Sequence, residues 1–224
     1  MTGAYRTLAG RGDASFEVQG SSFVGYASPA ATVDEAEAFV ASVRERHADA
    51  THNVPCYRVR VASGGPGSVT GGRSEPGGRG GGRSHGGHLL REYQSDDGEP
   101  TGSAGKPALN VLQQRDVENA VVVVTRYYGG TNLGVGGLAR AYSRAVKDAV
   151  DAAGVCRQRP QERFAVTVAY DDSGTVRGIL EGADCEFDAD YGEDVSFAVT
   201  VAAEDADALR ERIADATSGR ADVA

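Results

Sequence analysis

A glycine-rich segment that runs into a helical pattern is the first feature of this sequence whose residues could do chemistry. Thr125–Val150 reads TRYYGGTNLGVGGLARAYSRAVKDAV and holds five glycines within nine positions. A glycine-rich turn between a strand and a helix exposes free N–H groups at the positive end of the helix dipole, which is a general site for anions. The candidate anion-binding glycines are Gly129, Gly130, Gly134, Gly136 and Gly137.

The two common nucleotide-binding fingerprints fit this segment poorly. The phosphate-binding loop of many nucleotide enzymes needs a Lys directly after its last glycine, whereas Leu138 follows Gly137 here. The dinucleotide fingerprint matches only loosely, with Ala139 in place of the third glycine. The segment is therefore either a phosphate site of another kind or a turn whose glycines serve close packing.

Basic side chains follow the glycines at helical spacing. Arg140, Arg144 and Lys147 stand at i, i+4 and i+7, so they share one face of the predicted helix, with Asp151 at i+11. Arg126 ends the strand that precedes the glycines. Such a face can contact nucleic-acid phosphates or an acidic partner, and it can equally be an ordinary solvated helix face.

Three carboxylates crowd a second short segment, SDDGEPTGSAGKP. Asp96, Asp97 and Glu99 could bind a divalent cation or serve as acid and base, but Asp-Gly and Pro are also common turn residues. Thr101 or Ser103 is a natural N-cap for the helix predicted to follow. Lys106 lies in the first turn of that helix, where the dipole favours a cation only beside an anion. We therefore favour a turn, and we expect any anion to lie between Lys106 and the backbone N–H groups of residues 102–105.

Catalysis through a nucleophile has little support. His52 is followed by Asn53, and no Ser or Cys motif pairs with it. The three cysteines, Cys56, Cys156 and Cys185, form no C-x-x-C pair, which argues against a structural zinc site and a disulfide framework. We therefore assign no catalytic residue, no metal ligand and no cofactor.

The elements that must position these residues follow from the hydrophobic periodicity. A capping-box pattern at Thr32 and Glu35 starts one helix, and four consecutive valines indicate a strand that is buried on both faces. In this part of the chain the predicted strands are Ser15–Ser28 (two short strands), Thr51–Ala62, Leu89–Tyr93 and Glu118–Tyr128. The predicted helices are Thr32–Ala48, one from about Ser103, and one that follows the glycines to about Ala153 and ends at Gly154.

A segment of different character interrupts this pattern. From Ser63 to Gly87, 12 of 25 residues are Gly, interleaved with Ser and Arg, so the segment has too little apolar surface to order itself. We predict a disordered insertion over about 63–87. Its arginines resemble Gly/Arg tracts that touch RNA, although a tolerated flexible loop is the simpler interpretation.

The tail forms a second domain. We place the first domain at 1–157 and the second at 160–224, where the order strand, helix, strand, strand, helix is typical of a small α+β sandwich of the ferredoxin kind. Lys and Arg outnumber Asp and Glu by 18 to 16 up to Arg159, whereas the rest of the chain has 5 against 16. This split suggests two domains with different surfaces.

The overall composition bears on the source and the location of the protein. The net charge is −9 with only two lysines in 224 residues, which is typical of a halophilic protein. A melting temperature that does not rise in molar KCl would contradict this hypothesis. The segment MTGAYRTLAG has no apolar run, and no stretch approaches the ~20 apolar residues that span a membrane, so we expect a cytoplasmic protein without a membrane partner.

Three segments taken together resemble the IMPACT family, which includes the YigZ-type bacterial and archaeal proteins. They are ATHNVPCYRV, SDDGEPTGSAGKPALNVL and VVVVTRYYGGTNLGVGGLARAYSRAV, in this order, within a match that covers about Ser15–Ala153. The D-D-G-E-P and R-Y-Y-G-G motifs are highly specific. The family signature includes His52, Asn53, Asp96, Asp97, Gly98, Glu99, Pro100, Tyr128 and Tyr142.

The resemblance implies a two-domain α+β protein. The N-terminal domain should adopt the left-handed βαβ fold shared by ribosomal protein S-five and the fourth domain of the ribosomal translocase. The acidic tail should be ferredoxin-like, similar to the fifth domain of that translocase. We also expect the acidic turn to lie near Arg126 and the glycine-rich loop, with a carboxylate–arginine pair between them.

For function, the resemblance implies a link to RNA or the ribosome and no established catalysis. Eukaryotic relatives regulate translation. The first hypothesis is a translation-associated regulator whose partners are RNA or the ribosome, or a translation-related protein. Its predicted contacts are the glycines above with Lys106, Arg126, Arg140, Arg144 and Lys147. The alternatives are a kinase-like enzyme that holds ATP at the glycine-rich loop, and a protein–protein adaptor.

Overall fold

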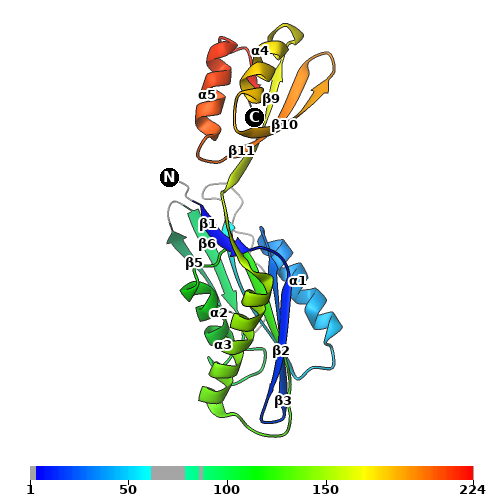
Figure 1. The fold of residues 1–224 in the computed structure, drawn as a ribbon, viewed down its shortest axis with the longest axis vertical. Coiled ribbons are helices and arrows are strands. Elements are labelled where there is room, and N and C mark those ends of the chain that lie inside the picture. Colours follow the sequence, from blue (N-terminus) through cyan, green and yellow to red (C-terminus); the bar gives the residue numbers. More distant parts are fainter. Residues whose placement is uncertain (1–3, 62–78, 86–87, 224) are drawn as a thin grey trace. The chain divides into compact units, whose positions relative to one another are not determined.

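The structure is a computed structural model, and it describes residues 4–61, 79–85 and 88–223. The chain divides into two compact units, Tyr5–Gln158 and a second that includes the residues from Arg159 onward (Figure 1). The fold is mixed α+β with two domains, which confirms the predicted class. Among the described residues, no helix has the length and apolar character that crossing a bilayer requires.

A six-stranded antiparallel sheet is the centre of the first unit. Its strand order is β2-β3-β7-β4-β6-β5, so strands distant in sequence lie side by side. The strands are β2 (Gly12–Val18), β3 (Ser21–Pro29), β4 (His52–Val61), β5 (Arg79–His85), β6 (His88–Gln94) and β7 (Ala120–Tyr127).

Helices cover both faces of this sheet, as Figure 1 shows. The helix α1 (Val33–Arg46) packs on one face, and α2 (Gly105–Gln114) and α3 (Gly134–Ala153) pack on the other. The central strand β7 supplies alternate valines to the two sides, with Val122 and Val124 toward α2 and α3. All four valines of β7 are fully buried, which agrees with the predicted two-sided burial.

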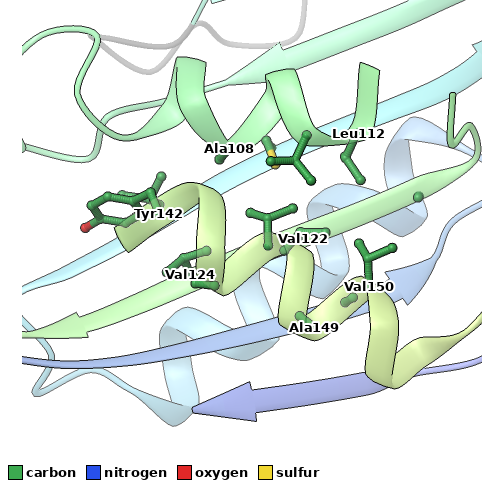
Figure 2. Close-up of a cluster of buried hydrophobic side chains, with 14 of the residues drawn as sticks. Ala108, Leu112, Val122, Val124, Tyr142, Ala149 and Val150 are labelled. Atoms are coloured by element: carbon green, nitrogen blue, oxygen red, sulfur yellow. The ribbon is translucent and has the colours of Figure 1, made fainter. Parts of the chain in front are cut away.

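The larger core lies between this sheet and the helix pair α2 and α3. In Figure 2, Ala108 and Leu112 of α2 lie opposite residues of α3, and Val122 and Val124 of β7 belong to the same buried cluster. The labelled α3 residues are Tyr142, Ala149 and Val150. The helix α3 approaches the strands closely because β2 and β3 carry glycines beneath it. A Cβ atom added at Gly25 would lie 2.5 Å from the carbonyl oxygen of Ala145.

Two short strands of the first unit are absent from the sequence-based prediction. The strand β1 (Tyr5–Leu8) pairs antiparallel with β8 (Val155–Gln158). Each has four residues, and they are about 150 residues apart in the sequence, so local periodicity carries little signal for this pairing.

The predicted disordered insertion is wrong for part of its span. Arg79–His85 form β5, an edge strand that pairs with β6 from Arg79↔Gln94 to His85↔His88. A glycine-rich backbone can form these ladder hydrogen bonds without any side-chain burial, which a composition argument does not consider. The rest of the predicted insertion, residues 63–78 and 86–87, lies outside the described residues.

The second unit has the predicted ferredoxin-like arrangement. Its elements are β9 (Gln161–Val168), α4 (Tyr170–Glu181), β10 (Cys185–Tyr191), β11 (Val195–Ala202), α5 (Ala206–Ala216) and β12 (Asp222–Val223). The antiparallel strand order is β10-β11-β9-β12, and the helices pack apolar residues such as Val176, Leu180 and Ile213 against the sheet. The two-residue strand β12 completes the sheet beyond the five predicted elements.

Candidate functional site

The first carboxylate of the acidic turn, defined here as Ser95–Pro100, caps the helix α2. Both carboxylate oxygens of Asp96 accept hydrogen bonds from backbone N–H groups, at 2.7 Å from Gly102, 3.0 Å from Ala104 and 2.8 Å from Gly105. These groups are the unpaired donors that every helix N-terminus leaves. Asp96 therefore takes the capping role predicted for Thr101 or Ser103. The buried hydroxyl of Ser103 has no partner among the described residues.

This capping removes the predicted anion site beside Lys106. Three of the backbone N–H groups of residues 102–105 already donate to Asp96. The side chain of Lys106 is exposed on the surface of α2. The negative charge that the helix dipole favours is thus supplied by the chain itself.

The second carboxylate joins the acidic turn to β4. Asp97 accepts a 2.6 Å hydrogen bond from the backbone N–H of Asn53 and pairs with Arg44 at 3.1 Å. Its backbone carbonyl lies 2.7 Å from Nδ1 of His52, so this ring nitrogen is the donor. Asp97 and Gly98 have φ of 47° and 85°, and a Cβ at Gly98 would lie 3.5 Å from the His52 ring. These signature residues fix the conformation of the turn.

The third carboxylate is buried against a cation. One oxygen of Glu99 accepts hydrogen bonds from Nη1 of Arg126 at 2.6 Å and from the Tyr142 hydroxyl at 2.8 Å. The Glu99 side chain is 3% exposed and that of Arg126 is 5% exposed. Burial, together with the charge and hydrogen bond of Glu99, raises the pKa of Tyr142. The structure thus contains the carboxylate–arginine pair that the sequence led us to expect.

Arg126 is buried and holds neighbouring segments together through hydrogen bonds. The predicted contact of this side chain with phosphate is therefore wrong. Its Nη2 donates to Ser21 Oγ at 3.3 Å, and its guanidinium lies 5.4 Å and 5.3 Å from the ring centroids of Phe23 and Tyr128. The reason is its place on the central strand β7, where helices and turns cover both faces. Its Nε has no partner among the described residues.

Three glycines of the glycine-rich loop (residues 129–137) are explained by backbone geometry. A Cβ at Gly129 would lie 1.9 Å from the backbone of Gly20, and the Gly129 N–H donates to Ser21 Oγ at 3.2 Å. Gly130 and Gly134 have φ of 85° and 68°, values that favour glycine. The packing interpretation therefore holds for these positions.

Packing does not account for Gly136. Its backbone angle is ordinary for a helix, and an added Cβ would meet only Nη1 of Arg140, at 3.5 Å. Gly134 to Gly136 are exposed, and no side chain in the described ranges accepts a hydrogen bond from the first N–H groups of α3. Glycine inside a helix costs about 1 kcal/mol relative to alanine, so an exposed glycine here suits a ligand that approaches the backbone.

The exposed cations form the basic face, defined here as Arg140, Arg144 and Lys147 of α3. These side chains line a shallow depression of about 500 Å³ together with Ala139 and Ser143. Within the described residues, no ion pair involves Arg140 or Lys147, whereas Arg144 pairs with Asp148 at 3.3 Å. The structure therefore brings together the predicted cations of this helix.

The surroundings of the basic face include residues that the sequence did not single out. Arg144 lies over the ring of Phe16, 4.1 Å from its centroid, and Asp151 is paired with Arg115. The Ser143 hydroxyl donates to the carbonyl of Pro107 at 3.4 Å, which places the start of α2, next to Lys106, beside the depression. No local pattern marks Phe16, because its contact with α3 exists only in the folded sheet.

Comparisons with known proteins agree with the motifs. A family model described as the Impact N-terminal domain matches residues 19–150, and one described as a domain of unknown function (DUF1949) matches residues 166–220. The IMPACT family member YvyE of Bacillus subtilis is 28% identical over 224 residues, which cover 100% of this chain and 91% of that protein. The IMPACT family member YigZ of Escherichia coli is 30% identical over 204 residues, which cover 91% and 88%.

A solved structure with a related sequence also aligns with this chain. The crystal structure of a hypothetical protein is 28% identical, covers 100% of this chain and 97% of its own, and has a TM-score of 0.64. Its agreement extends over both units of the chain.

Proposed function

The chain belongs to the IMPACT family, and we propose that it is a cytoplasmic translation-associated regulator that binds RNA or the ribosome. The observation that carries the proposal is the basic face beside the exposed, uncapped start of α3. Arg140, Arg144 and Lys147 would contact phosphates, with the N–H groups around Gly136 as additional donors.

The chemistry of the basic face supports a polyanion as the ligand. Its three cations lie within two turns of one helix, and Asp148 is the one carboxylate that pairs with them among the described residues. A row of cations at this spacing suits the repeated charge of a phosphate backbone. The family resemblance supports the translation part of the proposal, because eukaryotic members regulate translation.

A nucleotide-dependent enzyme has less support. Asp96 and Asp97 use both carboxylate oxygens within the acidic turn and its neighbours, and Glu99 pairs with Arg126. No cluster of three or more His, Cys, Asp or Glu side chains suited to a metal ion is found in the described ranges. These carboxylates would have to give up structural contacts before they could hold Mg²⁺.

Charge reversal on the basic face tests the proposal. We expect Arg140→Glu with Arg144→Glu to abolish co-sedimentation with ribosomes and binding of RNA, while the free energy of unfolding changes by less than about 1 kcal/mol, because both side chains are exposed.

The matched control is Arg157→Glu with Arg212→Glu. These residues are also exposed and the substitutions change the net charge equally, but they lie outside α3. Unchanged co-sedimentation of the α3 variant, or an equal loss in the control variant, would contradict a specific role for the basic face.

A further inference from the structure

Arg144 differs from the other two cations of the basic face in how it is held. Its guanidinium lies 4.1 Å above the ring of Phe16, and its Nε is 3.3 Å from Oδ2 of Asp148. The side chain is nevertheless 59% exposed. Arg144 is therefore held by an aromatic ring and a carboxylate while more than half of its side chain faces solvent.

The ring beneath Arg144 is anchored in the core. Phe16 stacks on Phe23 with ring centroids 5.4 Å apart and an angle of 9°, and Phe23 meets Tyr142 edge to face at 5.4 Å. Phe23 and Tyr142 are fully buried. This column of rings holds the guanidinium plane in place before any ligand arrives, so ordering it costs little side-chain entropy on binding.

A small hollow lies next to the guanidinium. It has a volume of about 220 Å³, and its lining combines the ring of Phe16 and aliphatic side chains with Gln19, Arg140 and Arg144. The same two arginines also line the depression that contains Lys147. Arg140 and Arg144 therefore border both a small hollow with an aromatic wall and a basic depression.

This arrangement fits a nucleotide strand whose bases are unpaired. Unpaired bases stack on aromatic side chains and on guanidinium planes, whereas the bases of a duplex are stacked within it and leave phosphates and sugars to be read. The hollow is smaller than the about 300–1,000 Å³ of typical ligand pockets, which suits one flat ring. A carboxylate of an acidic peptide would accept hydrogen bonds from the guanidinium N–H groups of Arg144, but the Nε–H group already pairs with Asp148.

We propose that Arg144, held on Phe16, is a stacking platform for an unpaired base, so that the basic face selects single-stranded over double-stranded RNA. This inference rests on the proposed function. Arg140 and Lys147 then contact the phosphates on either side of the stacked base, since no ion pair among the described residues engages them.

The test compares a 12-nucleotide single-stranded RNA, the same RNA with one abasic position, and its duplex, by fluorescence anisotropy. We expect the native chain to bind the single strand at least about tenfold more tightly than the duplex, in line with the stacking energy of one base. Arg144→Lys keeps the charge but removes the plane, so it should weaken single-strand binding about tenfold and leave duplex binding unchanged. Arg157→Lys, at an exposed position of β8 outside the basic face, is the matched control and should change both affinities less than about twofold.

The outcomes separate the inference from the function it rests on. Loss of affinity on abasic substitution in the native chain, but not in Arg144→Lys, supports the platform. Equal binding of single strand and duplex with no effect of Arg144→Lys overturns the platform and leaves RNA binding in place. Absence of binding to either RNA overturns both the stacking platform and RNA binding. Tight binding of a polyglutamate peptide that depends on Arg144, in a chain that binds neither RNA, overturns both as well.

Discussion

The acidic turn and the basic face use charged residues in opposite ways. In the acidic turn, Glu99 is 3% exposed and pairs with a buried arginine, and Asp96 is saturated by backbone N–H groups. On the basic face, Arg140 and Lys147 are exposed, and no ion pair in the described part of the chain engages them. Both regions carry the family motifs, so a shared motif does not by itself identify a binding residue.

Arg126 and Arg140 show the difference within one motif. Both residues belong to the motif segment Thr125–Val150. Arg126 lies on the central strand and its side chain is 5% exposed, whereas Arg140 is exposed on α3. A buried charge needs a fixed partner, while an exposed one is free to find a ligand. Burial therefore decides which of these arginines holds the fold and which is available to a ligand.

The largest expected effect comes from breaking the buried pair. Glu99→Ala should lower the free energy of unfolding by about 3–5 kcal/mol, because it leaves the Arg126 guanidinium buried without its carboxylate. Urea unfolding followed by circular dichroism measures this. Glu17→Ala, at an exposed position of β2, is the control and should change the value by less than about 0.5 kcal/mol. Similar small losses in both variants would mean that the acidic turn is not a structural centre.

The Tyr142 hydroxyl gives a smaller effect with a distinct pH dependence. Tyr142→Phe removes a donor to Glu99 and should cost about 1.5–3 kcal/mol at neutral pH. Because burial raises the pKa of Tyr142 in the folded state, the native chain should lose stability as pH rises above about 10, where the unfolded tyrosine ionises. In urea titrations above about pH 10, the free energy of unfolding of the native chain should therefore approach that of Tyr142→Phe. A difference that stays constant from pH 8 to pH 11 would contradict this.

The glycines extend the comparison to the loop itself. Gly129→Ala should destabilise the chain by about 1–3 kcal/mol, because the new methyl group meets the Gly20 backbone. Gly136→Ala should leave stability unchanged or raise it by up to about 1 kcal/mol, because nothing crowds that site. The same variant should weaken RNA binding if the backbone there approaches a phosphate. Unfolding and RNA-binding measurements on both variants check these expectations. Equal losses of stability in Gly129→Ala and Gly136→Ala would contradict the distinction between a packing glycine and a ligand-contacting glycine.

Much of the fold could be predicted from local pattern. Four consecutive valines marked β7 as a strand covered on both faces, and the predicted order strand, helix, strand, strand, helix of the tail is that of β9, α4, β10, β11 and α5. Local pattern is weak where pairing is distant and short, as for β1 with β8 and for β12.

The candidate site was predicted less completely, for a physical reason. Spacing was sufficient to place Arg140, Arg144 and Lys147 on one face, because helix geometry is local. The capping by Asp96, the burial of Arg126 and the ring of Phe16 under Arg144 depend on segments that meet only through the sheet order.

The salt dependence of RNA binding tests the central claim most directly. Each phosphate contact of a single strand contributes a slope of about −0.7 to the logarithm of the association constant against the logarithm of salt concentration. With Arg140 and Lys147 as the phosphate contacts, we predict a slope of about −1.4 in a KCl series for the native chain. For Arg140→Glu with Arg144→Glu, any remaining binding should show a slope between zero and about −0.7. Equal slopes for the two proteins would show that the exposed cations of α3 are not the RNA contacts.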